Sequence, residues 1–468
     1  MRIILWFDTE DYILPADDDA TLRLATFLSR EGVRAVFKLV GEKARVLVRR
    51  RRRDVIKGLK RHEIGFHTDF HSVHPTPAEY LSELGWDEGV AEFIRREGPG
   101  YRDVARIFGQ KPACYGQPGS SWGPQVFGAM RAWGMPVYMD SGRHVGLDGE
   151  PHYYGGALTF LNIRHETRVE LEGPADMETA KRDFLDAHAD LLKRGGGVVS
   201  IVYHPCEFVH RRFWDSVNFA RGANPPREEW KLPPKRTPAE VAAAFANFEA
   251  YIRFLKSFPD VSFITTGDAA RLYRDRARGH AFSRRELAAV AAGVTTRVSF
   301  QRHGHFALSA ADTLVLLMES VARGGKGAVR LRETPFGPSE PGPAMRGTVK
   351  TDWSQFSRTA DDVARYMSVH GRVPSAVWVG SVPVTPESWL VAAAGAARRL
   401  LAGRKPPARM ALKPAKLAAA DYVAADDPRL WGWVIFRKGF SAPAMMALAK
   451  RQAWTLKPAI QCGMLNAK

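Results

Sequence analysis

Two histidines four residues apart, His67 and His71, are the residues of this sequence best suited to bind a metal ion. Neutral imidazole is the commonest protein ligand for a divalent metal. On a helical turn, an i, i+4 pair would place both rings on one face. Ile64 and Phe66 just upstream are typical of a buried strand end. The pair is therefore expected at the C-terminal mouth of a strand, where α/β proteins keep their sites. Two histidines on a solvated turn are the alternative interpretation of this spacing.

A cluster of carboxylates follows the first apolar run of the chain. The run 3–7 is typical of a strand buried on both faces, as in parallel sheets. It leads directly into Asp8, Glu10 and Asp11. Carboxylates this close resist ionising together unless a cation is near, so the cluster favours a metal site over a helix cap or an acidic turn.

Strand-like runs alternate with helical stretches through the first 275 residues or so. The expected strands after the first are 33–41, 63–66, part of 111–122, 135–139, 197–203 and 261–266. The expected helices are 22–31, a basic stretch from residue 49, 80–97, 100–108, 175–193 and 239–258. This order predicts a parallel sheet with crossover helices, and about seven strands predict an α/β barrel. Two of these strands end in side chains that could move a proton, Asp140 and His204.

With these motifs in this order, residues 1 to about 275 resemble the NodB-like polysaccharide deacetylases, carbohydrate esterase family 4. The family's first motif implies Asp8 as the catalytic base and Glu10 as a metal ligand. Its second motif, His-Ser/Thr-x-x-His, is matched by 67–71 and implies both histidines as ligands. Its fifth motif, an apolar strand ending in histidine, implies His204 as the catalytic acid. The implied fold is a distorted, TIM-like (β/α) barrel of about seven strands.

The third motif departs from the family pattern. The family reads Phe-Arg-x-Pro, where this chain reads Tyr-Gly-Gln-Pro over 115–118. Gly116 therefore replaces the arginine that holds the catalytic aspartate ionised and oriented. Arg143 or Arg164 from another loop, or the charge of the metal itself, is expected to take over that role.

The remaining site expectations also follow from the resemblance. Asp140 matches the fourth motif loosely and is expected to orient His204. A backbone N–H near Tyr115 is expected to stabilise the developing oxyanion. Tyr115, Pro118 and Trp122 are expected to contact substrate, with core packing as the alternative for Trp122.

The implied activity is metal-dependent hydrolysis of an N-acyl group, such as acetyl, on an N-acetylated sugar, a polysaccharide or a lipid-linked glycan. Zinc is the first choice because two histidines and one carboxylate suit it, and cobalt, nickel or manganese fit the same donors. An allantoinase-like hydrolase of cyclic amides is one alternative. A non-catalytic glycan-binding pseudoenzyme, in which the lost arginine marks decay, is another. Neither the sugar nor the oligomeric state follows from the sequence.

Composition bounds the classes of partner and compartment. The chain has 468 residues, a net charge of +18, 45% hydrophobic residues and three cysteines. The positive charge favours anionic partners, but no nucleic-acid motif accompanies the basic run 49–53, which is interpreted as a solvated helix face. The cysteines show no CxxC spacing, no signal peptide precedes the first strand, and no apolar run reaches about 18 residues. A cytoplasmic protein without a transmembrane segment and without a nucleic-acid partner is expected.

After the last expected strand, the sequence pattern changes to a weak internal repeat. Segment 308–317 resembles segment 384–393, about 76 residues later, and a third fragment at 440–458 is a candidate to continue the series. A Ser or Thr before each amphipathic run is an N-cap pattern, which predicts helix-rich modules. The expected division is a catalytic domain over 1–280 and a C-terminal region over 281–468. Binding of substrate or a partner is one interpretation of that region, and a purely structural appendage is the other. Truncation near residue 280 is expected to leave a folded barrel.

Overall fold

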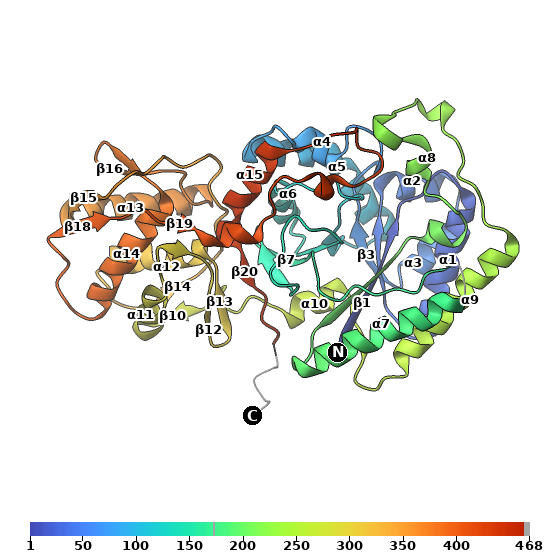
Figure 1. The fold of residues 1–468 in the computed structure, drawn as a ribbon, viewed down its shortest axis with the longest axis horizontal. Helices are drawn as coiled ribbons and strands as arrows, with labels where there is room; N and C mark the ends of the chain where they lie inside the picture. Colours follow the sequence, from blue (N-terminus) through green and yellow to red (C-terminus); the bar gives the residue numbers. More distant parts are fainter. Residues whose placement is uncertain (172–173, 463–468) are drawn as a thin grey trace.

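The computed structural model describes residues 1–171 and 174–462, which form two units lying side by side (Figure 1). The unit on the right of Figure 1 is built around a large sheet, and the unit on the left is rich in helices. The first 275 residues supply most of the right-hand unit, and the final part of the chain returns to it. No helix of the described residues is long and apolar enough to cross a membrane.

Among the described residues, one curled sheet of ten strands forms the centre of the first unit. Its order is β20-β6-β7-β5-β4-β3-β2-β1-β8, and β9 pairs with the start of β1. The strands from β7 to β8 and the short β9 are parallel, whereas β6 and β20 are antiparallel to their neighbours. The bounds are β1 (Arg2–Thr9), β2 (Val36–Leu39), β3 (Glu63–Phe66), β4 (Cys114–Tyr115), β5 (Val137–Met139), β6 (His152–Tyr154), β7 (Ala157–Phe160), β8 (Val198–Tyr203), β9 (Ser262–Phe263) and β20 (Lys457–Pro458).

The α/β class matches the expectation, but the strand number of about seven is corrected to ten within the described part of the chain. The hairpin β6–β7 and the C-terminal strand β20 were not predicted. Both hairpin strands are short, and β20 has only two residues, so neither contains an apolar run long enough to stand out. Their pairing depends on contacts between distant segments, since β20 lies about 300 residues beyond β6.

Most helices of this unit pack against one face of the sheet, and α10 contributes to the apolar cluster on the other face. Those of the first unit are α1 (Pro15–Arg30), α2 (Gly41–Arg49), α3 (Arg53–Leu59), α4 (Pro77–Leu81), α5 (Trp86–Phe108), α6 (Val126–Trp133), α7 (Pro174–Lys193), α8 (Trp214–Asn218), α9 (Pro238–Lys256), α10 (Thr266–Leu272) and α15 (Pro443–Gln452). Two expected helices over 80–108 are largely one, because α5 continues through Pro99. The basic run 49–53 is the turn between α2 and α3 rather than the face of one helix.

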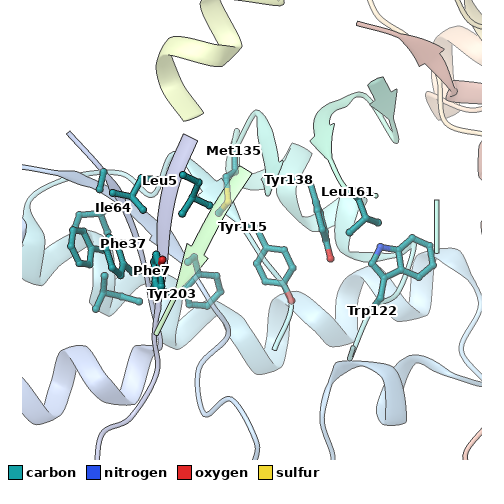
Figure 2. Close-up of a cluster of buried hydrophobic side chains, with 14 of the residues drawn as sticks. Leu5, Phe7, Phe37, Ile64, Tyr115, Trp122, Met135, Tyr138, Leu161 and Tyr203 are labelled. Carbon is teal, nitrogen blue, oxygen red and sulfur yellow. The ribbon is translucent and has the colours of Figure 1, made fainter. Parts of the chain in front are cut away.

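Strand β1 explains why the sheet is buried on both sides. Leu5 and Phe7 belong to one apolar cluster, while Ile4 and Trp6 on the opposite face belong to another. All four are essentially inaccessible to solvent. Figure 2 shows Leu5 and Phe7 beside aromatic side chains of the neighbouring strands. Full burial of such a side chain contributes about 1.5–3 kcal/mol, so this strand anchors the sheet that carries the site.

The second unit contains two copies of one arrangement. Each copy has a strand, a helix, a β-hairpin, a second helix and a closing strand that pairs antiparallel with the first. The first copy is β10 (Ala281–Phe282), α11 (Arg284–Ala292), β12 (Gln301–His303), β13 (Phe306–Leu308), α12 (Ala310–Ala322) and β14 (Val329–Arg330). The second is β15 (Val349–Asp352), α13 (Trp353–His370), β16 (Val377–Val379), β17 (Val382–Val384), α14 (Pro386–Leu401) and β18 (Arg409–Leu412). The short β11 (Arg297–Val298) and β19 (Lys416–Leu417) pair with each other.

The two similar sequence segments are the hairpin-to-helix junctions of these copies. Ser309 and Thr385 cap α12 and α14 by accepting from the backbone N–H three residues on. Both copies share one apolar core, to which α12 and α14 contribute most. The third fragment does not continue the series. Its helix α15 and strand β20 pack on the barrel instead, and no hairpin precedes them.

The part of the chain after the second copy, residues 418–458, is called the return segment below. Val423, Trp431, Met445 and Leu456 lie in the same apolar cluster as the core of the first unit. The Tyr154 hydroxyl donates to the Ala449 carbonyl at 2.8 Å. Figure 1 shows this segment, in red, running over the upper side of the sheet. The core of the barrel is therefore completed by residues from the end of the chain.

Candidate metal centre

Of the three carboxylates at the end of β1, two lie on the same side of the strand and the third lies in a turn away from them. Side chains alternate along a strand, so Asp8 and Glu10 point to the same side. Asp11 accepts hydrogen bonds from the N–H groups of Ile13 and Leu14 at 2.9 and 3.2 Å. Asp11 thus closes a turn beside a separate group of charged residues. The geometry therefore brings Glu10, and not the neighbouring Asp11, to the histidines.

The two histidines follow β3 on a loop rather than on the expected helical turn. Thr68 and His71 have positive φ angles of 66° and 59°. These left-handed residues turn the chain back on itself, so the rings converge without a helix, with centroids 5.0 Å apart. The expected convergence is present, but the local structure that produces it is corrected.

Glu10, His67 and His71 bring three possible ligand atoms within 4.8 Å of one another. Glu10 Oε2 lies 2.8 Å from Nε2 of His71 and 3.8 Å from Nε2 of His67. All three side chains are buried. The Nε2 atoms of both histidines are buried and face Glu10, but neither makes a well-aligned hydrogen bond, which is the arrangement a metal ion would complete.

The other ring nitrogens of both histidines are already engaged. His67 Nδ1 lies 3.0 Å from the Gly116 carbonyl, and His71 Nδ1 contacts the Ser72 hydroxyl. A carbonyl can only accept, so His67 carries its proton on Nδ1 and leaves the Nε2 lone pair free. Burial lowers the pKa of His67, which favours the neutral form of the ring. Burial opposes ionisation of Glu10, but His71 and His67 outweigh it and lower the pKa of that carboxyl. Two imidazoles, one carboxylate and fixed outer contacts fit a divalent metal.

Lys38, in the middle of β2, occupies the space that the missing arginine would fill. Its ammonium lies 2.9 Å from Asp8 Oδ1 and 2.6 Å from Asp140 Oδ2, and it donates to the Met139 carbonyl at 3.0 Å. The Lys38 side chain is completely buried. Burial raises the pKa of Asp8, but His67 and Lys38 outweigh this and hold it below its usual range. Lys38 therefore keeps the carboxylate of Asp8 ionised and oriented.

Gly116 is required by this arrangement. A Cβ atom at that position would stand 2.0 Å from Lys38 Nζ and 2.4 Å from Asp140 Oδ2. Glycine in the third motif thus leaves the space that the buried lysine occupies, so the two residues depend on each other. Arg143 and Arg164, the expected replacements for the arginine, are both solvent-exposed, and Arg164 donates to the Asp148 carbonyl instead. That expectation is corrected.

His204, at the end of β8, pairs with Glu207 rather than with the expected Asp140. Its Nδ1 contacts a Glu207 carboxylate oxygen, and Glu207 is held in turn by Arg168. Its Nε2 lies 3.7 Å from Asp8 Oδ2. Burial lowers the pKa of His204, but Glu207 outweighs it and raises the pKa to about 9. Asp140 pairs with Lys38, and burial raises its pKa to about 8.

Two of the three residues expected to contact substrate are buried in the core instead. Tyr115 and Trp122 are completely buried in the apolar core, as Figure 2 shows, and Trp122 stacks on His144 at 4.9 Å. Direct contact of these two side chains with a substrate is therefore corrected to core packing. Pro118 lies in the loop after β4, and its contact with substrate stays a prediction.

The return segment supplies a wall of the site that the sequence did not suggest. The Trp433 ring stands edge-on to His71 with centroids 5.3 Å apart, and its indole N–H donates to Asp215 Oδ2 at 2.8 Å. The ring of Trp214, in α8, also lies near His71, with centroids 6.0 Å apart. The Trp433 ring also packs on the backbone of Gly119, where a Cβ would come within 2.3 Å. Two tryptophans thus enclose the His71 side of the centre.

Sequence reasoning missed Lys38, Glu207 and Trp433. A lysine inside the otherwise apolar strand 36–39 is unusual, because a buried ammonium needs a partner, and this could have pointed to Lys38. Glu207 lies three residues after His204, a spacing at which side chains can meet. Nothing in the local sequence of Trp433 indicates that its ring packs against the distant His71.

Comparison with protein-family models gives no match, and comparison with curated protein sequences gives none either. Among solved structures, a Mycobacterium smegmatis protein described as a polysaccharide deacetylase has 15% identity and a TM-score of 0.37, over 58% of this chain and 88% of that one. An allantoinase has 14% identity and a TM-score of 0.37, over 58% and 89%. A peptidoglycan N-acetylglucosamine deacetylase has 16% identity and a TM-score of 0.31, over 57% and 86%. At these scores the likenesses carry no argument about activity.

Proposed function

We propose that this protein is a metal-dependent hydrolase that removes an N-acyl group, such as acetyl, from an N-acylated amino sugar, as the NodB-like motifs of the sequence suggest. One observation carries the proposal. The buried Nε2 atoms of His67 and His71 face Glu10 without a well-aligned hydrogen bond, beside an ionised aspartate, Asp8, and a histidine, His204. This grouping at one end of a parallel sheet supports the proposal of a metal ligand set, a base and an acid that act together.

Glu10, His67 and His71 would hold the ion, with zinc as first choice and cobalt, nickel or manganese permitted by the same donors. A bound divalent ion supplies a lowered pKa for water and polarisation of the acyl carbonyl. Residues of the chain carry out the proton transfers. Asp8, which Lys38 keeps ionised, takes a proton from a water molecule as the water oxygen adds to the carbonyl carbon. His204, kept protonated by Glu207, gives a proton to the leaving nitrogen as the C–N bond breaks. The products are a carboxylate and a free amine.

The arrangement around Asp8 favours an enzyme over a decayed, glycan-binding protein. Loss of the third-motif arginine would leave Asp8 without a cation if nothing replaced it. Lys38 fills that space and Gly116 makes room for it, so the electrostatic role is retained by different residues. A protein that had lost its activity would not be under selection to keep a cation beside Asp8. Hydrolysis of a cyclic amide requires the same groups and stays open as an alternative substrate class.

The enclosure of the site favours a compact substrate or the end of a chain. The three metal-binding side chains are nearly inaccessible, and His204, at 22% exposure of its side chain, is the open side of the site. Trp214 and Trp433 close the side next to His71. A soluble or lipid-linked amino sugar can approach His204, whereas the middle of a rigid polymer would collide with these walls.

Metal content tests the ligand set. The wild-type protein should bind about one divalent ion per chain, and H67A and H71A should each lose most of it, because each removes one of three protein ligands. H188A is the matched control, since His188 pairs with Asp260 far from the centre. Elemental analysis after dialysis gives the result. Full occupancy in H67A and H71A would overturn the ligand assignment.

Activity is tested on the metal-loaded protein. N-acetylglucosamine, a nucleotide-linked N-acetyl sugar, chitooligosaccharides and allantoin are incubated separately, and loss of acetyl or ring opening is followed by mass spectrometry. Release of acetate from a compact amino sugar supports the proposal. Turnover of allantoin alone would assign the cyclic-amide alternative, and glycan binding without any turnover would assign the binding protein.

A further inference from the structure

A second cavity lies between the barrel and the repeat unit, away from the metal centre. It has a volume of about 350 Å³ and is lined by residues of α6, of the β6–β7 turn, of α10 and of the return segment. Gly134 and Pro136, which line it, precede β5, whereas Asp140 of the site network follows β5. The cavity therefore faces the N-terminal ends of the strands and is distinct from the metal centre at their C-terminal ends.

The walls of this cavity carry more cations than anions. Four cationic side chains line it, and two carboxylates do. The cations are Arg131, Arg274, Arg278 and Lys457, and the anions are Asp275 and Glu333. Both carboxylates are taken, since Lys457 lies 2.6 Å from Asp275 and Arg278 lies 3.0 Å from Glu333. Among residues 1–171 and 174–462, neither Arg131 nor Arg274 forms an ion pair.

Arg131 is the central group of the cavity. Its guanidinium donates to the carbonyls of Thr334 and Gly155 at 3.1 and 3.4 Å and lies over the Phe336 ring at 3.5 Å. A guanidinium has five N–H donors, and the two carbonyls use only part of them. Burial lowers the pKa of Arg131 to about 10, which reflects a cation held without a carboxylate. An uncompensated buried charge is costly unless a counter-charge completes it.

We propose that this cavity binds the phosphate group of a small phosphate ester. Arginine forks match phosphate oxygens in a bidentate way, and Arg131 is held in place by its carbonyl partners and by Phe336. Arg274, exposed at the rim, supplies a second cation. The lining also contains Phe127, Tyr153 and Leu158, which suits the organic part of an ester. The volume lies in the range of small-ligand pockets, about 300–1,000 Å³. The ligand would bridge the two units, since Thr334 belongs to the repeat unit and Arg131 to the barrel.

Binding is measured on the full-length protein by isothermal titration calorimetry at fixed ionic strength. The probes are inorganic phosphate and glucose 6-phosphate, with citrate as an anion that is not a phosphate. Glucose 6-phosphate should bind with a Kd below about 1 mM, and citrate should bind at least tenfold more weakly. Absence of binding by both phosphate probes at 10 mM would overturn the proposal, as would equal binding of citrate.

The variants R131Q and R274Q test the two unpaired cations. Each should weaken phosphate binding by roughly tenfold or more, because each removes a charge-assisted hydrogen bond. R274Q lies at the rim and keeps the test valid if R131Q fails to fold, which thermal unfolding reveals. R285Q is the matched control. Arg285 is exposed on α11, and its substitution removes the same charge from the protein. Equal weakening in R285Q, or unchanged binding in both cavity variants, would show general attraction to a basic protein and overturn the proposal.

Discussion

The two units of the protein treat buried polar groups in opposite ways. In the repeat unit, buried polar side chains such as Ser309 and Ser388 take part in helix caps or bond neighbouring backbone. Over described residues 281–417, Ser320 alone has a buried side-chain polar atom without a partner. In the barrel, buried polar atoms without partners are frequent and include both Nε2 atoms of the histidine pair. Buried, unsatisfied polar groups are costly, so their concentration at one end of the barrel marks where chemistry is expected.

The comparison also shows that the units are not divided at one point of the chain. The repeat unit has its own apolar core, but the barrel borrows residues from the return segment after it. The same segment brings Trp433 to His71. The repeat unit therefore lies within a long insertion between two parts of the barrel, and the predictions below test that difference.

The largest effect is expected from removing the end of the chain. Truncation after residue 280 should leave an insoluble or molten barrel, the reverse of the outcome expected from the sequence. It would expose core positions now covered by Trp431, Met445 and Leu456, each of which contributes about 1.5–3 kcal/mol. That total is comparable to the stability of a whole domain, about 5–15 kcal/mol.

Replacing residues 281–417 by a flexible Gly/Ser linker is the paired experiment. This deletion keeps the return segment, so the barrel should remain folded, as measured by gel filtration and circular dichroism on heating. If the full truncation folds as well as this variant, the return segment is not part of the barrel core. If neither folds, the two units share one core.

The next largest effect concerns the proton-transfer groups. D8N and H204A should each reduce turnover by about 10²–10⁴-fold, the usual contribution of a positioned acid or base. Both should keep the metal, since neither is proposed as a ligand. D352A is the control from the repeat unit, because it removes the side-chain cap of α13, costs about 1 kcal/mol of stability and should leave turnover unchanged. Near-normal turnover in D8N or H204A would require the assigned roles to be withdrawn.

A pair of glycine substitutions separates the buried network from ordinary backbone strain. G116A places a Cβ 2.0 Å from Lys38 Nζ, so it should displace the lysine, lower turnover about 10–100-fold and cost about 1–3 kcal/mol of stability. G380A, in the β16–β17 turn at φ of 63°, has open space around it. It should cost about 1 kcal/mol and leave turnover unchanged. Kinetics with metal content checked in parallel distinguish the two, and equal turnover in both variants would mean that Lys38 does not support Asp8.

The smallest expected effect is a shift in pH dependence. His204 acts in its protonated form, and Glu207 raises its pKa to about 9, so activity should fall as the pH rises through this pKa. E207Q removes the carboxylate and should move the alkaline limb to lower pH by about one unit or more, with kcat less affected well below it. The pKa of His204 in the folded protein exceeds its ordinary value of about 6.5. The His204–Glu207 pair therefore stabilises the fold fully below about pH 6.5, and this stabilisation is lost as the pH rises towards 9. E240Q is the control, since Glu240 pairs with Arg211 on the surface. An unshifted limb in E207Q would assign that limb to another group.

Much of the site could be predicted because chemistry-bearing residues stand directly after apolar runs. Asp8 lies at the end of a strand that the sequence shows plainly, and Glu10, the histidine pair and His204 each follow such a strand. Parallel strands place their C-terminal ends at one edge, so these residues had to meet. The hairpin β6–β7 and the loop conformation of the histidines were not predictable, since short strands and left-handed residues leave little trace in composition.

The sequence by itself determined the α/β class, the identity of the metal-binding and proton-transfer candidates, and the two similar modules, because each depends on local pattern or on spacing along one segment. Only the tertiary structure decided which groups partner them. Lys38 reaches Asp140 across 102 positions, Glu207 takes the place expected of Asp140, and Trp433 reaches Asp215 across 218. Such choices depend on distance and burial in the folded chain. A lysine, a glycine or a tryptophan has no fixed role until folding determines which charge or ring it meets.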